Sequence, residues 1–303
     1  MKSYYLLEFG KDSRGRVVCP PRPVYGRPFI IDGNYRIPTS LVGEINSFDA
    51  KSTWRMDLMP GIPANHSLNE AIAIEFSKKG EAEHASVASF ARHTLQLMTM
   101  SSPASLLVGA QEAALDEIKH AKMCYGIAEK FLGENIQPSS LDVDGSARAQ
   151  SREEVIQSVI NEGCIGETIA AIQAQFGYHL AKQPLVKDTL KTIAADESNH
   201  SQLAWSTIHW AIERFPDLKD IAEETFREQL DRQITSLNSF RINHCYDCEQ
   251  DSALRDHGLL LDEDEASTQK LGIQNVIGPN VQNNFHNIED ISKQIISIDF
   301  SKY

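Results

Sequence analysis

The pattern of apolar and polar residues divides the chain at Ser67. Before it, prolines interrupt the sequence repeatedly, and the apolar runs are short and β-prone, such as Phe29-Ile30-Ile31 ahead of Asp32-Gly33-Asn34. Proline blocks helix continuation, and Asp-Gly favours tight turns. Residues 1–66 are therefore predicted to form an irregular segment with one hairpin that covers the rest of the molecule.

After Ser67, apolar and polar residues mix through long stretches without proline, which predicts helices bounded by capping signals. Residues 67–70 and 151–154 are capping boxes, in which a serine hydroxyl and a glutamate carboxylate each satisfy a free N–H group. Pro103 is well placed at a first helical position, and Gly133 marks a helix end. The four long helices expected from these signals span about residues 68–98, 103–132, 152–182 and 184–214.

The connections between these helices predict their topology. The breaks between the first and second helices and between the third and fourth are only a few residues long, so each pair is expected to be an antiparallel hairpin. The connection over residues 133–150 is longer. About 18 residues can reach about 60 Å, whereas a helix of about 30 residues is about 45 Å long, so the third helix can start parallel to the second. The sequence thus predicts an all-α, four-helix bundle with one long crossover.

Residues 216–303 are expected to form a helical C-terminal extension. Pro216-Asp217 restarts a helix that runs to about Leu237. The short helical pieces that follow are predicted to be broken by Gly258, Gly272, Gly278 and Pro279. The acidic run at residues 262–265 is interpreted as solvated surface. The predicted organisation is an N-terminal segment (1–66), a bundle (67–215) and the extension (216–303).

A repeated motif carries the candidate chemistry. Residues 113–120 and 193–200 share the frame D-E-x-x-H, at matching distances after the prolines that open their helices. Glu117 and His120, like Glu197 and His200, are three residues apart, so each pair lies on one helix face. Charged groups inside a bundle are costly unless they are paired or bind metal. One such pair is usually solvated, but two at equivalent depth indicate a metal site.

The neighbouring helices are expected to supply carboxylates at the same depth. Counting residues back from the hairpin turns places Glu83 level with Glu117, and Glu167 level with Glu197. Glu162 is the alternative ligand on the third helix. On an ideal α-helix it lies about 140° from Glu167. Both could therefore reach one site only through a π-bulge, or with one of them behind the other.

This set of four carboxylates and two imidazoles resembles the ligands of the ferritin-like di-iron carboxylate superfamily, over about residues 68–214. Members include monooxygenases, acyl desaturases and rubrerythrins. The resemblance implies a ferritin-like bundle with two iron ions, although manganese suits the same ligands. The implied metal ligands, through which catalysis would act, are Glu83, Glu117, His120, Glu167, Glu197 and His200. The first three would surround one ion and the last three the other, with one glutamate of each motif bridging. Asp116 and Asp196 would hold the ligand histidines.

Composition and charge narrow the classes of function. A formal charge of −13 over 303 residues opposes binding to nucleic acid. No apolar run is long enough to span a bilayer, and the first residues lack signal-peptide features, so a cytoplasmic protein without membrane contact is expected. The five cysteines are odd in number and dispersed, which fits reduced thiols. The one C-x-x-C pair, Cys245 and Cys248, lacks the second half of a zinc site.

The favoured function is a non-haem di-iron oxidase or oxygenase. It would use O₂ as co-substrate to hydroxylate, desaturate or N-oxygenate a small or carrier-bound organic substrate, with an electron-donor protein as a further partner. The alternative is a ferroxidase or peroxide-scavenging iron protein, and a bundle with a vestigial ligand set is a third option. An oxygenase should have a covered, apolar route to the metals, whereas a ferroxidase should have a short, carboxylate-lined approach. The sequence leaves the substrate and a homodimer open.

The segments outside the bundle favour the oxygenase. About 66 residues precede the bundle and nearly 90 follow it, which is more than a simple ferritin subunit needs. Small residues on the inner faces of the helices also leave room for a substrate, although they equally permit close helix packing. These residues are Ala113, Ala114, Ala170, Ala171 and Ala174.

Overall fold

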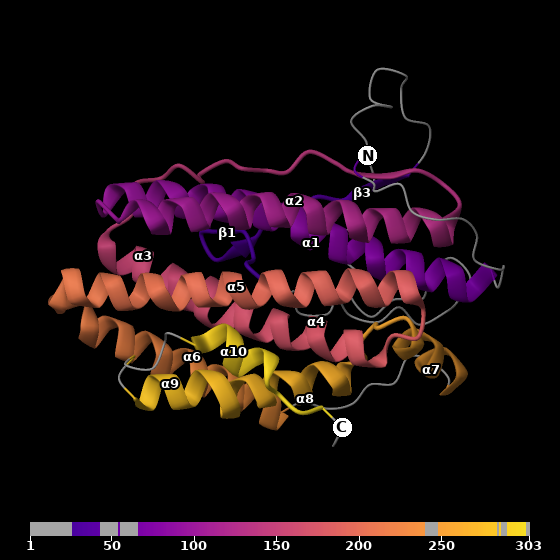
Figure 1. Ribbon diagram of the computed structural model, residues 1–303. Helices are drawn as coiled ribbons and strands as arrows, with labels where there is room; N and C mark the ends of the chain where they lie inside the picture. The colour runs from indigo at the N-terminus through magenta and orange to yellow at the C-terminus, as the bar shows by residue number, and fades with distance from the viewer. Residues whose placement is uncertain are drawn as a thin grey trace.

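The computed structural model describes residues 26–42, 54, 66–239, 248–283, 285 and 290–300, and this part of the chain is mostly helical (Figure 1). Two long helices, α1 (His66–Thr99) and α2 (Ala104–Leu132), pack against each other as an antiparallel pair. The helix α5 (Pro184–Arg214) packs against α4 (Thr168–Leu180) and also contacts α2. The predicted all-α class is confirmed for the described residues.

The third long helix is a composite of three segments. It consists of α3 (Arg152–Ser158), the π-helix η2 (Val159–Glu167) and α4, which follow one another without a break. The predicted capping box at its start is confirmed, because Ser151 accepts from the backbone N–H of Glu154 and the Glu154 carboxylate accepts from that of Ser151. The π-helix is a local widening of the turn, in which each N–H bonds to the carbonyl five residues earlier.

The connection after α2 returns along the length of the helices. Gly133 ends α2 in the left-handed conformation (φ 78°), and its N–H donates to the carbonyl of Glu129. In Figure 1 the chain then runs back beside α2, so that α4 points the same way as α2. Within this connection, β4 (Ile136–Pro138) pairs antiparallel with β3 (Ser40–Val42) of the N-terminal segment.

The predicted hairpin in the N-terminal segment is confirmed. It joins β1 (Ile30–Ile31) to β2 (Asn34–Tyr35) through Asp32 and Gly33, both with positive φ (49° and 75°), as a tight primed turn requires. Phe29 and Ile31 are buried against Ala85 of α1. The hairpin thereby covers one side of the α1–α2 pair. Most of residues 1–66 lie outside the described residues.

The C-terminal extension forms a further helical layer against α4 and α5 (Figure 1). Its elements are η3 (Pro216–Leu218), α6 (Lys219–Ser239), α7 (Cys248–Asp256), α8 (Asp262–Gly272), η4 (Ile273–Ile277), α9 (Gly278–Gln282) and α10 (Ile291–Ile296). Gly258 (φ 65°) lies in the turn after α7, as predicted.

The predicted breaks at Gly272, Gly278 and Pro279 are wrong. The chain stays helical from Asp262 to Gln282, and η4 is a π-helix that carries it through the glycines and the proline. A proline ring clashes with the carbonyl four residues earlier in an α-helix, and the wider π-turn directly before Pro279 avoids that α-helical bond. At Gly272, a Cβ would lie only 3.1 Å from Cδ1 of Ile172, so the glycine permits close packing against α4.

The interpretation of residues 262–265 as solvated surface is also wrong for Asp264. This carboxylate is buried, accepts from the backbone N–H of Leu261 at 2.9 Å, and pairs with Nε of Arg255 at 2.8 Å. The run is the first turn of α8, where acidic side chains complement the helix dipole. Its role is therefore to start α8 and tie that helix to α7.

The buried apolar residues form two main clusters. The larger fills the space between the composite third helix, α5 and the C-terminal extension. The second lies between α1, α2, α5 and the residues around α7. Within the described chain, none of the helices combines the length and apolar character that a membrane crossing requires.

Candidate metal centre

The two D-E-x-x-H motifs face each other where α2 contacts α5. Glu117 and His120 on α2, and Glu197 and His200 on α5, each lie one turn apart. All four side chains are buried in the interior. Burial of four ionisable groups in one place is expensive, so the site needs a compensating charge.

Six side chains form two overlapping donor groups. The first group consists of Glu83, Glu117, His120 and Glu197, and the second of Glu117, Glu167, Glu197 and His200. In each group the candidate ligand atoms lie within 4.8 Å of one another. Both groups contain Glu117 and Glu197, so these two carboxylates contribute to both sets of candidate ligand atoms. The structure thus brings all six residues of the sequence hypothesis together.

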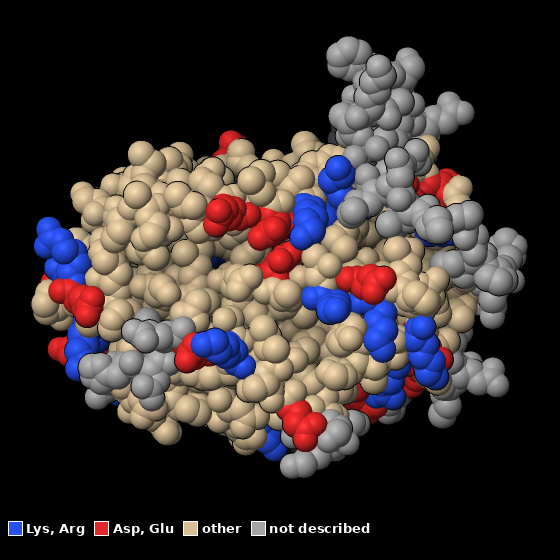
Figure 2. Space-filling model, in the orientation of Figure 1, with Lys and Arg blue, Asp and Glu red and all other residues tan. Residues whose placement is uncertain are grey.

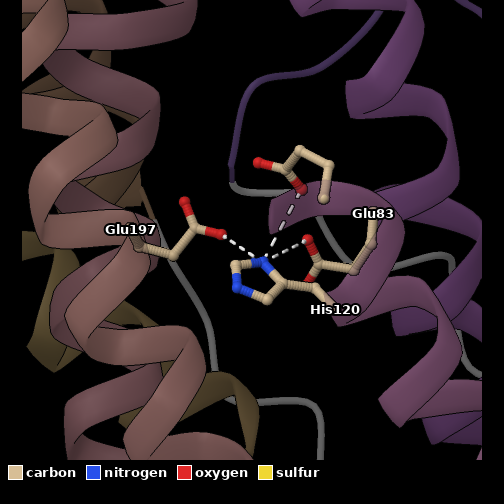
Figure 3. Close-up of side chains that lie close together, drawn as sticks. Glu83, His120 and Glu197 are labelled. Carbon is tan, nitrogen blue, oxygen red and sulfur yellow. Dashed lines mark ion pairs between the residues drawn. The ribbon is translucent and has the colours of Figure 1, made fainter. Parts of the chain in front are cut away.

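The Nδ1 atoms of the histidines point into these groups. Figure 3 shows His120 between carboxylates: its Nδ1 lies 3.3 Å from Glu197 Oε1 and 3.7 Å from Glu83 Oε2. His200 is arranged similarly, with Nδ1 3.2 Å from Glu117 Oε1 and 3.4 Å from Glu197 Oε2. Each imidazole therefore presents its Nδ1 lone pair toward the shared glutamates.

The opposite nitrogen of each histidine contacts an aspartate of the other motif. Nε2 of His120 lies 3.1 Å from Asp196, and Nε2 of His200 lies 3.5 Å from Asp116. Lys119 also pairs with Asp196 at 3.0 Å. A carboxylate at Nε2 keeps the proton there and leaves Nδ1 free as a metal ligand. The aspartates implied by the resemblance are present beside the histidines, and each lies against the histidine of the opposite helix.

Unpartnered atoms test whether the cluster suits a metal. Among the described residues, hydrogen-bond partners are lacking for Nδ1 of both histidines, Nε2 of His200, both carboxylate oxygens of Glu117 and Glu167, and one oxygen of Glu197. Buried acceptors of this kind are costly. Carboxylate oxygens with imidazole nitrogens suit iron, manganese or zinc. The donor set therefore fits two divalent ions, and it could bind a metal.

The pKa values of the clustered side chains reflect their burial and the charges of their neighbours. Burial, reinforced by the charges of Glu117 and Glu197, raises the pKa of Glu83 to about 8. Burial and the same two neighbours also raise the pKa of Glu167. For His120, burial would lower the pKa, but the surrounding carboxylates outweigh it and raise the pKa above the usual range. Without a cation, the cluster therefore retains protons, which metal binding would release.

The π-helix decides which helix-three glutamate faces the cluster. Glu167 lies in the second donor group, whereas Glu162 lies outside both groups. Glu162 is buried, and it accepts from Arg92 at 2.7 Å and from the Ser89 hydroxyl at 2.9 Å. The structure thus favours Glu167 over the alternative. Both options considered for the two glutamates are found together: a π-helix is present, and Glu162 lies behind Glu167.

Two arginines beside Glu162 were not anticipated from the sequence. Arg92 lies on α1, and Arg27 lies just before the hairpin, with its guanidinium fully buried and 4.0 Å from Glu162. The signal that could have found Arg92 is its place three turns after Glu81 and two after Ala85 on a largely apolar helix face. Arg27 lies in a proline-rich stretch without periodicity, so no pattern pointed to it.

Other side chains near the site have structural contacts. Cys124 and Cys164 are free thiols buried in the core. Glu81 and His84, which flank Glu83 in the sequence, are both partly buried: Glu81 accepts from Ser40 at 2.6 Å, and the ring of His84 lies edge-on against that of Trp54. Of the predicted small residues, Ala113 and Ala171 are buried in helix packing. The C-x-x-C pair falls outside the described residues, because Cys245 and the side chain of Cys248 are not described.

Comparison with protein-family models, curated proteins and solved structures found no match for this chain. The residues of the cluster and their geometry are therefore the basis for assigning a function. What these support directly is a mostly helical chain with a buried cluster of glutamates and histidines that could bind metal.

Proposed function

We propose that the six-residue cluster is a dinuclear metal centre in a ferritin-like four-helix bundle, and that the protein is an O₂-dependent di-iron oxidase or oxygenase of an organic substrate. The observation that carries the proposal is that two buried donor groups share Glu117 and Glu197. A mononuclear site has no use for the second group. Two ferrous ions held there would supply electrons for the reduction of O₂.

The chain's own residues prepare this chemistry. Asp196 lies 3.1 Å from Nε2 of His120 and fixes that proton, and Asp116 lies 3.5 Å from Nε2 of His200, so both Nδ1 atoms face the glutamates. Glu117 and Glu197 reach both donor groups, and Glu83 and Glu167 each belong to one. Because four carboxylates carry four negative charges, two divalent ions are neutralised at the site. Phe90, whose ring lies 5.1 Å from that of His200, adds an apolar wall that keeps water away.

The segments outside the bundle favour an oxygenase over a simple iron store. The hairpin of the N-terminal segment covers α1, and the extension adds a layer on α4 and α5. A bundle that only oxidises iron needs neither layer. The covering supports the exclusion of water from the metals, which an organic oxidation requires.

A ferroxidase is the second candidate, and it is favoured by one edge of the site, where carboxylates on α1, α2 and α5 reach solvent. There the side chains of Asp116, Asp196 and Glu83 are 34%, 20% and 18% exposed, so carboxylates connect the cluster to solvent. Figure 2 shows acidic side chains near the middle of the visible face, with basic ones beside them. Such a short acidic approach attracts hydrated Fe²⁺.

Aerobic addition of excess Fe(II) separates the two candidates. For an oxygenase, we expect oxidation to stop at two irons per chain and O₂ consumption to resume only with an electron donor and an organic substrate. Sustained oxidation of many irons per chain would instead identify a ferroxidase. Glu197→Ala should abolish iron binding more completely than Glu162→Ala, because Glu197 belongs to both donor groups and Glu162 to neither. Equal loss in the two variants would reject the ligand assignment.

A further inference from the structure

A second buried polar cluster lies behind the metal centre and contains more positive than negative charge. It consists of Arg27, Arg92 and Glu162, with Ser89 beside them. Both oxygens of Glu162 are already used: Oε1 accepts from Arg92 at 2.7 Å and Oε2 from Ser89 at 2.9 Å. Arg92 also donates to the carbonyl of Ile30. One carboxylate thus faces two guanidinium groups, and that of Arg92 is the nearer of the two.

Arg27 is the guanidinium group that Glu162 does not bind through a hydrogen bond. Its side chain is fully buried, and none of its Nε, Nη1 and Nη2 atoms has a hydrogen-bond partner among the described residues. Its carbon Cζ lies 4.7 Å over the centre of the Phe90 ring, which offsets part of the charge but accepts no in-plane N–H bond. A buried guanidinium with all its donors free is among the most costly arrangements in a protein.

Among the side chains that the structure describes, none of the neighbours of Arg27 supplies the missing charge. Burial, with the nearby guanidinium groups, lowers the pKa of His93 well below its usual range, so this imidazole is neutral. Burial raises the pKa of the Cys164 thiol, which is therefore neutral as well. Arg27 also interacts electrostatically with Glu167, but the charge of that carboxylate is committed to the metal centre. The four glutamates there balance two divalent ions, so the cluster behind them keeps one uncompensated positive charge.

We propose that Arg27 binds the carboxylate group of an organic ligand, so that the substrates of the metal centre are carboxylic acids. This inference rests on the proposed function, because it places the subsite beside the dinuclear centre. A single missing charge calls for a monoanion, and a guanidinium fork matches the two oxygens of a carboxylate. Gly163 packs directly against the guanidinium: a Cβ at this position would lie 3.2 Å from Nη1 of Arg27 and 2.4 Å from Cβ of Ala204. Phe90 separates the guanidinium from the ring of His200 and offers an apolar surface to the rest of the ligand.

Charge variants of opposite sign provide the test. The protein is loaded with Zn(II), which is redox-inert, and binding of benzoate, benzamide and inorganic phosphate is measured by calorimetry. Arg27→Gln should weaken benzoate binding by about 10- to 100-fold, because it removes charged hydrogen bonds. Glu162→Gln should strengthen benzoate binding, because it removes the competing negative charge. Arg36→Gln is the matched control, since Arg36 lies in the same segment but pairs with Asp142 at the surface. It should leave benzoate binding unchanged.

Opposite effects of the two central variants cannot arise from a shared loss of folding. Equal weakening by Arg27→Gln and Glu162→Gln would overturn the proposal and make the cluster structural. Benzoate that binds no better than benzamide would also overturn it, leaving ordered water as the partner of Arg27. Preferential binding of phosphate would reject the carboxylate assignment. Metal analysis of the same samples separates the two claims: two zinc ions without benzoate affinity reject the subsite alone, whereas failure to bind zinc rejects the dinuclear centre.

Discussion

Replacement of Glu83 by glutamine should stabilise the metal-free protein while it weakens metal binding. Glu83 is the one ligand at the edge of the cluster, with 18% of its side chain exposed, and burial beside Glu117 and Glu197 raises its pKa to about 8. In the unfolded chain the same carboxyl titrates near its ordinary value of about 4.3. The folded, metal-free protein therefore holds a proton on Glu83 over a pH range in which the unfolded chain has lost it.

The raised pKa sets both the sign and the size of the effect. A carboxyl whose folded pKa exceeds its unfolded value contributes stability that is fully present below the unfolded pKa and is lost as pH rises toward the folded pKa. Each pH unit above the unfolded pKa lowers the free energy of unfolding by about 1.4 kcal/mol. Keeping Glu83 protonated in the folded protein therefore costs about 2 kcal/mol at pH 6 and up to about 5 kcal/mol at pH 8. Glutamine has nearly the same shape but no charge, so it removes this cost. At about 2 °C per kcal/mol for a chain of this size, Tm should rise by about 4 °C at pH 6 and by up to about 10 °C at pH 8.

Thermal unfolding in the presence of a chelator, at pH 6, 7 and 8, measures this effect. Glu112→Gln is the matched control, because Glu112 is an exposed glutamate on α2 outside both donor groups. A Tm gain that does not grow with pH, or that Glu112→Gln reproduces, would refute the reasoning. With Zn(II) or Mn(II) present, the order should reverse, since Glu83→Gln removes a ligand oxygen from the first group.

Three further predictions concern the site and its support. Glu117→Ala should abolish binding of both ions, whereas Glu83→Ala should retain one, as metal analysis of the purified variants will show. Asp196→Asn should weaken metal affinity by about 10- to 100-fold, measured by competition with a chelator, because it disturbs the proton on Nε2 of His120. Gly163→Ala should destabilise the fold by about 1–3 kcal/mol in denaturant unfolding, since its Cβ would lie 2.4 Å from that of Ala204.

Local signals in the sequence were enough to predict the long helical stretches between residues 66 and 214. Capping at Ser151 and the left-handed end at Gly133 depend on neighbouring residues alone, and both appear in the structure as expected. The repeat of D-E-x-x-H identified the chemistry because residues three apart on a helix must share a face. Glu83 and Glu167 followed from counting helical rise, which is insensitive to packing detail.

The features that sequence reasoning missed depend on contacts between distant segments. Arg27 is buried because the hairpin packs onto α1 and η2, and no local pattern encodes that docking. The continuity of the helix through Gly272 and Pro279 depends on a π-turn and on close packing against α4, which override the usual helix-breaking preferences. The crossing of Asp116 and Asp196 to opposite histidines depends on the relative rotation of α2 and α5.

The sharing of ligands between helix pairs makes the metal a link between two halves of the chain. The first donor group takes Glu197 from the second half, and the second takes Glu117 from the first. If the chain were cut in the connection between α2 and α3, neither fragment would hold a complete donor group. Divalent metal should then drive the two fragments to reassociate, and a chelator should separate them. Size-exclusion chromatography of co-expressed fragments would show this, and fragments that associate equally well without metal would contradict it.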